Sequence, residues 1–179
     1  IPADRIEAGT YLVAAAVTNG SITIDKINPD RLMKVINKIE NTGSSISYDK
    51  NSISISMDKD RPDPVDITTA PFPEFPTDMQ AQFSVINAIS SGVSNIYETV
   101  FENRFMHILE LNRMGCNIEV KGNHALIKGV ESIYGAQVMA TDLRASASLI
   151  LAGLCAKGET VVDRIYHIDR GYERIEEKL

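Results

Sequence analysis

Cysteine and long apolar runs are scarce in this sequence, and basic residues are fewer than acidic ones. Two cysteines in 179 residues make no disulfide framework, which favours a reducing compartment. The formal net charge of -6 argues against nucleic acid or an anionic membrane as the main partner, because both demand a basic surface. The longest apolar stretch, residues 147–156, is broken by Ser148 and Gly153 and is too short to cross a bilayer, and nothing resembles a signal peptide. A cytoplasmic protein is expected.

Several common chemical motifs are also missing. The sequence contains no Walker loop, dinucleotide fingerprint or nucleophile elbow. The three histidines lack the spacing of metal ligands and are interpreted as structural: His107, His124 and His167. Cys116 and Cys155 fall in a predicted strand and an apolar helix, where packing is favoured over nucleophilic work. These histidines and cysteines are therefore weak candidates for metal binding or catalysis.

An internal repeat is the most informative feature that is present. Each of three copies opens on an aspartate, continues through a run of small and apolar residues to a glycine, and then passes through a β-rich segment to an arginine. The distance from glycine to arginine is 11, 12 and 12 residues. The aspartates are Asp4, Asp78 and Asp142, and the arginines are Arg31, Arg104 and Arg170. The glycines are Gly20, Gly92 and Gly158, and each is expected to adopt the left-handed conformation that commonly follows a helix.

The repeat predicts an α+β fold built from three βαβαββ units. Apolar residues at helical spacing follow the first two arginines, and these helices end at Gly43 and Gly115. Paired strands follow, and the alternation in residues 53–57 predicts one buried face. We expect a single pseudo-threefold domain over residues 1–179, an inside-out α/β barrel whose Ala- and Ser-rich helices are buried inside sheets. The units span approximately 1–60, 61–130 and 131–179. The outer strands of the first and third units are absent, so an excised domain is expected.

Three arginines point to an anion-binding site. Arg104, Arg144 and Arg170 sit at predicted helix starts, where a positive side chain opposes the helix dipole and contributes nothing to stability. Helix starts also present backbone N–H groups that suit phosphate and carboxylate. Pseudo-threefold symmetry would bring equivalent helix starts together. The alternative is a set of separate surface ion pairs with neighbouring acids, namely Glu102, Asp142 and Asp169.

Asp78 has two interpretations. It lies at the end of a proline-rich approach, residues 71–78, just before a predicted helix, where an acid commonly caps the helix. If Thr77 takes the cap instead, the Asp78 carboxylate is left to accept a proton from a substrate hydroxyl as a general base. The sequence leaves both interpretations open.

Several longer segments resemble segments of one protein family, and they occur in the same order along the chain. Residues 69–82, 98–107, 135–148 and 163–174 are similar to segments of the enolpyruvyl transferases that act on UDP-N-acetylglucosamine, and residues 4–10 extend the match. The resemblance implies transfer of the enolpyruvyl group of phosphoenolpyruvate to the 3′-hydroxyl of the nucleotide sugar with release of phosphate. This is the committed step of peptidoglycan precursor synthesis. It implies two similar domains of three βαβαββ units each, and no metal or redox cofactor.

The resemblance also assigns roles to residues by position. Asp78 matches the acid that contacts the sugar hydroxyl and acts as the base, and Val100 matches a backbone contact to the nucleotide sugar. Arg104 and Arg144 match groups that hold the carboxylate of phosphoenolpyruvate. Two further residues complete the set: Arg170, which matches a phosphate ligand, and Asp142, which matches an acid that positions a loop of the other domain.

The chain departs from the family in one respect. The second domain normally brings a mobile loop with a proton-donating cysteine and further lysine and arginine ligands, and neither Cys116 nor Cys155 occupies that loop motif. The isolated domain is therefore expected to be inactive without its partner domain. Two alternatives stay open: a non-catalytic binding or assembly module with exposed sheet edges, and the related enzyme that acts on shikimate 3-phosphate.

Overall fold

The computed structural model describes residues 3–179, so the first two residues of the expected unit 1–60 lie outside the described residues. The helices are α1 (Arg5–Val17), α2 (Met33–Glu40), α3 (Gln80–Ala88), α4 (His107–Arg113), α5 (Leu143–Cys155) and α6 (Ile175–Lys178), with the 3-10 helices η1 (Pro29–Arg31), η2 (Thr77–Met79) and η3 (Ile165–Arg170). The strands are β1 (Ser21–Asp25), β2 (Ser45–Tyr48), β3 (Ser52–Ser56), β4 (Ile67–Thr68), β5 (Val93–Tyr97), β6 (Asn117–Lys121), β7 (His124–Lys128), β8 (Gln137–Met139) and β9 (Val161–Asp163). The mixed helix-and-sheet class is confirmed.

The strands form three separate sheets in the order of the chain. The first has the order β1-β3-β2 and is antiparallel throughout. The second has the order β4-β5-β7-β6, in which β4 and β5 run parallel, and the third is the parallel pair β8-β9. The predicted alternation in β3 is confirmed, because Ile53 and Ile55 are 0% and 3% exposed while the serines that alternate with them are partly exposed.

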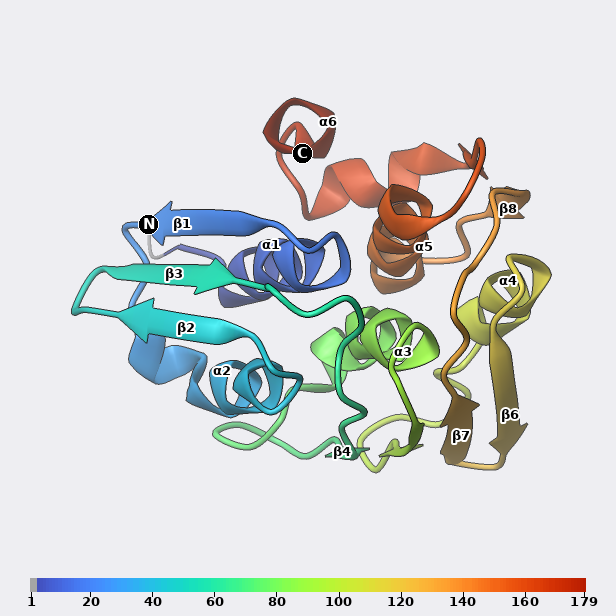
Figure 1. Ribbon diagram of the computed structural model, residues 1–179, viewed down its shortest axis with the longest axis horizontal. Helices are drawn as coiled ribbons and strands as arrows, with labels where there is room; N and C mark the ends of the chain where they lie inside the picture. Colours follow the sequence, from blue (N-terminus) through green and yellow to red (C-terminus); the bar gives the residue numbers. More distant parts are fainter. Residues whose placement is uncertain (1–2) are drawn as a thin grey trace.

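Three helices pack against one another at the centre of the molecule, with the sheets around them (Figure 1). These are α1, α3 and α5, and each also contacts a strand of the sheet that follows it in the sequence. Leu12, Phe83 and Leu149 supply fully buried side chains to this core. Gly9 allows a close approach, because a Cβ atom there would lie 3.0 Å from the side chain of Met79. Small residues therefore let α1 reach the segment that precedes α3.

Helix ends follow the sequence signals only in part. Asp4 caps α1, so the helix begins at Arg5, six residues before the apolar run that starts at Tyr11. Gly43 and Gly115 adopt φ of +94° and +93° after α2 and α4, as expected of glycines that end helices. Gly158 is also left-handed, but Gly20 and Gly92 are not, so that prediction was wrong. After α1 the left-handed residue is Asn19, with φ of 53°.

Two further features bear on the site. Within residues 3–179, no helix combines the length and the apolar character needed to span a bilayer. The start of α5 is closed by Asp142, whose carboxylate accepts the backbone N–H of Arg144 at 2.8 Å and of Ala145 at 2.9 Å. The N–H groups expected to be available for an anion at this helix start are therefore already bound within the chain.

Candidate functional site

Asp78 lies in η2, directly before α3, and its carboxylate joins two arginines. Oδ1 accepts a hydrogen bond from Nη2 of Arg104 at 2.9 Å, and Oδ2 accepts one from Nη2 of Arg144 at 3.2 Å. The side chain is 36% exposed. Its oxygens cap no helix, because η2 has Pro76 at its N-cap and no side-chain cap. Of the two interpretations of Asp78, the structure therefore favours a carboxylate that is not used as a cap.

Thr77 does not take the cap either. It is the first residue of η2, and its hydroxyl donates to Oε2 of Glu98 at 2.7 Å. Thr77 therefore does not cap the helix in the way that the second interpretation supposed, although the Asp78 carboxylate is free of a capping role as that interpretation required. The reason is tertiary: a buried carboxylate competes for the hydroxyl and supplies a charged acceptor, which forms a stronger hydrogen bond than a neutral one.

Arg104 and Arg144 reach Asp78 from different parts of the fold. Arg104 lies three residues before α4 and not inside it, and its guanidinium lies over the ring of Phe101 at 4.7 Å. Arg144 is the second residue of α5 and the less exposed of the two. Burial opposes its charge, but the Asp78 carboxylate and the Tyr172 hydroxyl outweigh that effect, so the pKa of Arg144 is raised. We call Asp78, Arg104 and Arg144 the acid–arginine cluster.

The acid–arginine cluster faces a cavity of about 490 Å³. Its lining comes from three parts of the chain: Asp78, Asn103, Arg104, Met106, Asp142, Leu143 and Arg144. Two guanidiniums share one carboxylate here, so their remaining N–H groups can bind a second anion with the planar geometry that carboxylates and phosphates match. Each Asp78 oxygen also keeps a lone pair that can accept a hydrogen bond from a hydroxyl.

The other predicted site residues lie near the acid–arginine cluster without joining it. Asp142 lines the cavity, but its carboxylate is held by the α5 N–H groups. Val100 lies outside the cavity lining, in a turn, and its N–H donates to Glu98 at 2.9 Å. Arg170 is the last residue of η3 and not a helix start, so that prediction was wrong. It is exposed, but the next residue, Gly171, packs against Leu143 at the start of α5.

Glu98 and His107 are the residues near the site that the sequence did not single out for a role there. Glu98 is a buried acid directly after β5, and no spacing rule marked it. His107 opens α4, is 3% exposed and contacts Ser84 Oγ at 3.3 Å. Burial lowers the pKa of His107 to about 4, and the nearby charges of Asp142 and Arg104 oppose and reinforce that effect respectively. Its imidazole is therefore neutral at physiological pH, which fits the structural role expected for it.

The described part of the chain contains neither a group of residues placed to bind a metal ion nor a reactive thiol. Residues 3–179 contain no group of three or more His, Cys, Asp or Glu side chains placed to hold a metal ion. Burial raises the pKa of Cys116 to about 12 and that of Cys155 to about 11. Neither thiol is poised as a nucleophile, because the reactive species is the thiolate.

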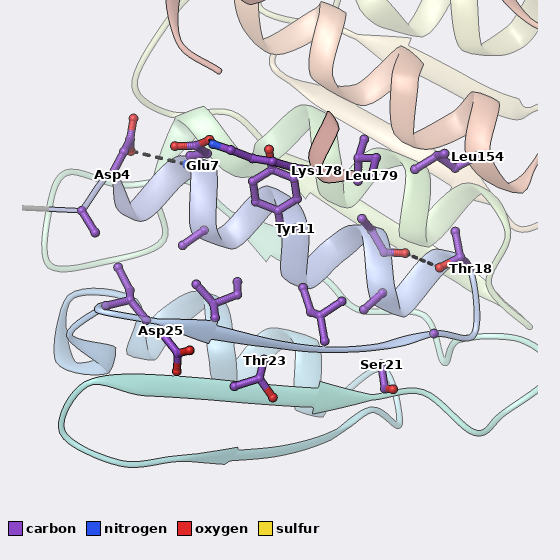
Figure 2. A pocket seen from close by; sticks show the side chains of 18 residues that line it. Asp4, Glu7, Tyr11, Thr18, Ser21, Thr23, Asp25, Leu154, Lys178 and Leu179 are labelled. Atoms are coloured by element: carbon purple, nitrogen blue, oxygen red, sulfur yellow. Dashed lines mark hydrogen bonds and ion pairs between the residues drawn. The ribbon is translucent and has the colours of Figure 1, made fainter. Parts of the chain in front are cut away.

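A larger cavity, about 780 Å³, lies away from the acid–arginine cluster. It is a groove along α1, with Ser21, Thr23 and Asp25 of β1 on one side (Figure 2). On the other side lie Tyr11, Leu154, Lys178 and Leu179, and Lys178 pairs with Glu7 at 2.8 Å. Mostly apolar residues and an open strand edge suit a segment of polypeptide better than a small anion. We define it as the α1–β1 groove.

Comparison with known proteins assigns the chain to a family. The family model for EPSP synthase (3-phosphoshikimate 1-carboxyvinyltransferase) matches residues 1–179, and the chain belongs to this family. Two curated relatives, the UDP-N-acetylglucosamine 1-carboxyvinyltransferases of Shewanella sp. (strain ANA-3) and Shewanella putrefaciens (strain CN-32 / ATCC BAA-453), are each 59% identical over 176 residues. The match covers 98% of this chain and 42% of each relative, so the chain spans less than half of their length.

Solved structures show the same fold. The enolpyruvyl transferase NikO from Streptomyces tendae superposes with a TM-score of 0.88 at 27% identity, over 98% of this chain and 42% of that one. EPSP synthase from Acinetobacter baumannii gives a TM-score of 0.72 at 17% identity, over 97% and 43% of the two chains, and shows the fold alone. The resemblance expected from the sequence is confirmed.

Proposed function

We propose that the protein containing this chain transfers the enolpyruvyl group of phosphoenolpyruvate to the 3′-hydroxyl of UDP-N-acetylglucosamine and releases phosphate, the committed step of peptidoglycan precursor synthesis. The observation that carries the proposal is the acid–arginine cluster, in which one carboxylate bridges two guanidiniums beside a cavity. It occurs in a chain 59% identical to relatives named for this activity. A cytoplasmic location belongs to the same proposal, because both substrates are charged and do not cross a membrane unaided.

The reaction proceeds by addition and elimination. Asp78 accepts the proton of the sugar 3′-hydroxyl while the oxygen of that hydroxyl attacks C2 of phosphoenolpyruvate. An acid elsewhere in the protein protonates C3. The product of this step is a phosphorylated tetrahedral ketal. A proton then leaves C3, the C2–C3 double bond forms again, and the C2–O bond to phosphate breaks. No electrons enter or leave, so no redox cofactor is required.

The arginines bind the negative groups of phosphoenolpyruvate. Arg104 and Arg144 hold its carboxylate, exchanging part of their contact with Asp78 for the substrate. Arg170 holds the phosphate, and Asp142 positions a loop of the other domain. The N–H of Val100 is already bound to Glu98, so its backbone contact to the nucleotide sugar uses the carbonyl oxygen. Releasing Asp78 from the arginines frees its oxygens for the sugar hydroxyl.

The rest of the protein supplies the remaining groups and strands. We infer a pseudo-threefold domain of βαβαββ units over residues 1–179, with the helices inside. The sheets support this inference: β5 and β9 each have a parallel neighbour, whereas β1 has none among residues 3–179. The α1–β1 groove then receives an extended segment parallel to β1, from the part of the protein that the 42% coverage leaves out. The isolated chain therefore supports no turnover.

Phosphate release by the full-length protein tests the proposal. Wild type is expected to release phosphate from phosphoenolpyruvate with UDP-N-acetylglucosamine and not with shikimate 3-phosphate. Asp78→Asn, which keeps the shape of the side chain, should lower kcat by about 10²-fold or more with an unchanged melting temperature. Asp58→Asn, on an exposed acid outside the cavity, is the matched control.

Three results would overturn the proposal in different ways. Turnover of Asp78→Asn within twofold of wild type removes Asp78 from the chemistry. Turnover with shikimate 3-phosphate instead of the nucleotide sugar assigns the related activity. Binding of neither substrate, together with self-association through β1, assigns an assembly module.

A further inference from the structure

Glu98 is the most deeply buried acid near the acid–arginine cluster. It is 2% exposed and follows directly after β5. Burying a carboxylate is unfavourable unless hydrogen bonds replace the lost water. Glu98 forms no ion pair within residues 3–179, and four uncharged donors surround it instead. Burying a carboxylate in such an environment costs free energy that an apolar side chain filling the same space would not cost. Packing alone therefore does not explain an acid at this position.

The four donors come from three segments that are distant in the sequence. Oε1 accepts from the Thr69 hydroxyl at 2.8 Å, from the Val100 N–H at 2.9 Å and from the Phe101 N–H at 3.1 Å. Oε2 accepts from the Thr77 hydroxyl at 2.7 Å. Thr99 adds a second connection, since its N–H donates to Thr69 Oγ1 at 2.9 Å and its hydroxyl to the Thr69 carbonyl at 2.5 Å. One carboxylate thus joins the end of β4, the start of η2 and the turn after β5.

Two of these segments carry the acid–arginine cluster. Thr77 is the residue before Asp78 in η2. The turn held at Val100 and Phe101 leads within three residues to Arg104, and the Phe101 ring lies under the Arg104 guanidinium at 4.7 Å. Asp78 and Arg104 are themselves joined at 2.9 Å. Glu98 therefore closes a loop of contacts that includes Asp78 and Arg104, and it is not among the residues that line the cavity.

We propose that Glu98 is a positioning residue, which fixes Asp78 and Arg104 relative to each other and holds the Val100 carbonyl toward the nucleotide sugar. The proposal rests on the proposed function and deepens it. A carboxylate is suited to this task because it accepts only, and each of its oxygens takes more than one donor. Small displacements of a base from its proton lower turnover steeply, so a shifted Asp78 reduces kcat even when the fold is kept.

The kinetic test uses the full-length protein and separates positioning from stability. Thr77→Val removes one donor at nearly constant volume, and it is the informative variant if Glu98→Ala fails to fold. We expect Thr77→Val to lower kcat at least tenfold while its melting temperature stays close to that of wild type. Glu98→Ala should lower kcat further. Glu98→Gln should restore most of the kcat that Glu98→Ala loses, because the glutamine amide oxygen still accepts from the N–H groups of Val100 and Phe101. Glu131→Gln, on an exposed acid outside the cavity, is the control.

A second measurement does not depend on activity. In the NMR spectrum of the full-length protein, Glu98→Gln should move the amide proton signals of Val100 and Phe101, and Thr77→Val should move the Nε–H signal of Arg104. Kinetic constants within twofold of wild type for Thr77→Val and Glu98→Ala, measured at a temperature where both are folded, overturn the positioning role. If wild type itself releases no phosphate, the proposed function fails, and an unmoved Arg104 signal in Thr77→Val then overturns the positioning role separately.

Discussion

Acidification below pH 6.5 should destabilise this chain through one buried histidine, His107. Burial lowers its pKa to about 4 in the folded chain, against 6.5 for an exposed histidine. Between these two values the unfolded chain binds a proton that the folded chain does not. The contribution of the neutral imidazole to stability is therefore complete above pH 6.5 and is lost as the pH falls towards 4.

The size of the effect follows from the width of that pH window. Each unit of pKa difference corresponds to about 1.4 kcal/mol, so a window from 6.5 to about 4 gives about 3 kcal/mol in the free energy of unfolding. The slope is about 1.4 kcal/mol per pH unit within the window. A loss of this size is a large share of the stability of an ordinary domain.

Urea denaturation at several pH values between 4 and 8 measures the effect, followed by circular dichroism because the chain has no tryptophan. Carboxylates titrate over part of the same range, so the informative quantity is the difference between wild type and His107→Gln at each pH. Glutamine keeps a group that can contact Ser84 but does not titrate. His167→Gln, at a partly exposed position, is the control.

The difference between wild type and His107→Gln should be flat above pH 6.5 and then change by about 3 kcal/mol towards pH 4. A difference that stays constant across the whole range would refute the reasoning, because the histidine would then carry the same number of protons in the folded and unfolded chains.

Three further outcomes are expected. Leu12→Ala, at a fully buried position of α1, should lower the free energy of unfolding by about 2–5 kcal/mol in urea denaturation, whereas Leu109→Ala at a 71% exposed position should change it by less than about 0.5 kcal/mol. Cys116 and Cys155 should react slowly with a disulfide reagent at pH 8 and rapidly after unfolding, because their raised pKa values leave little thiolate; rapid labelling of the folded chain would contradict this. In the full-length protein, Arg144→Lys should raise the KM for phosphoenolpyruvate about tenfold or more in steady-state kinetics, because lysine cannot form the planar two-point contact; an unchanged KM would remove Arg144 from substrate binding.

The order of secondary-structure elements could be predicted from the sequence, because it rests on local signals. The alternation around Ile53 and Ile55 identified β3, and Gly43 and Gly115 marked the ends of α2 and α4. Exact ends were harder to predict. Asp4 starts α1 earlier than the apolar run suggests, since a cap depends on a single side chain and not on periodicity.

Only those parts of the site that follow from the internal repeat could be predicted from the sequence. The expectation that helix starts converge placed Arg104 and Arg144 in one site, and the structure joins both to Asp78. Arg170 was misplaced, because the expected helix start after the third β-rich segment is replaced by the end of η3. Glu98 was missed because its partners lie up to 29 residues away, and hydrogen bonds between distant segments leave no period in the sequence.

The most direct test of the account is a crystal structure of the full-length protein with UDP-N-acetylglucosamine and 2-phospholactate, which lacks the reactive double bond of phosphoenolpyruvate. The measured quantity is the distance from the nearer Asp78 carboxylate oxygen to the 3′-hydroxyl oxygen of the sugar. We predict about 2.6–3.2 Å, with Arg104 and Arg144 turned to the carboxylate of the analogue. A sugar hydroxyl out of hydrogen-bond reach, with Asp78 still bridging both arginines, would contradict the account.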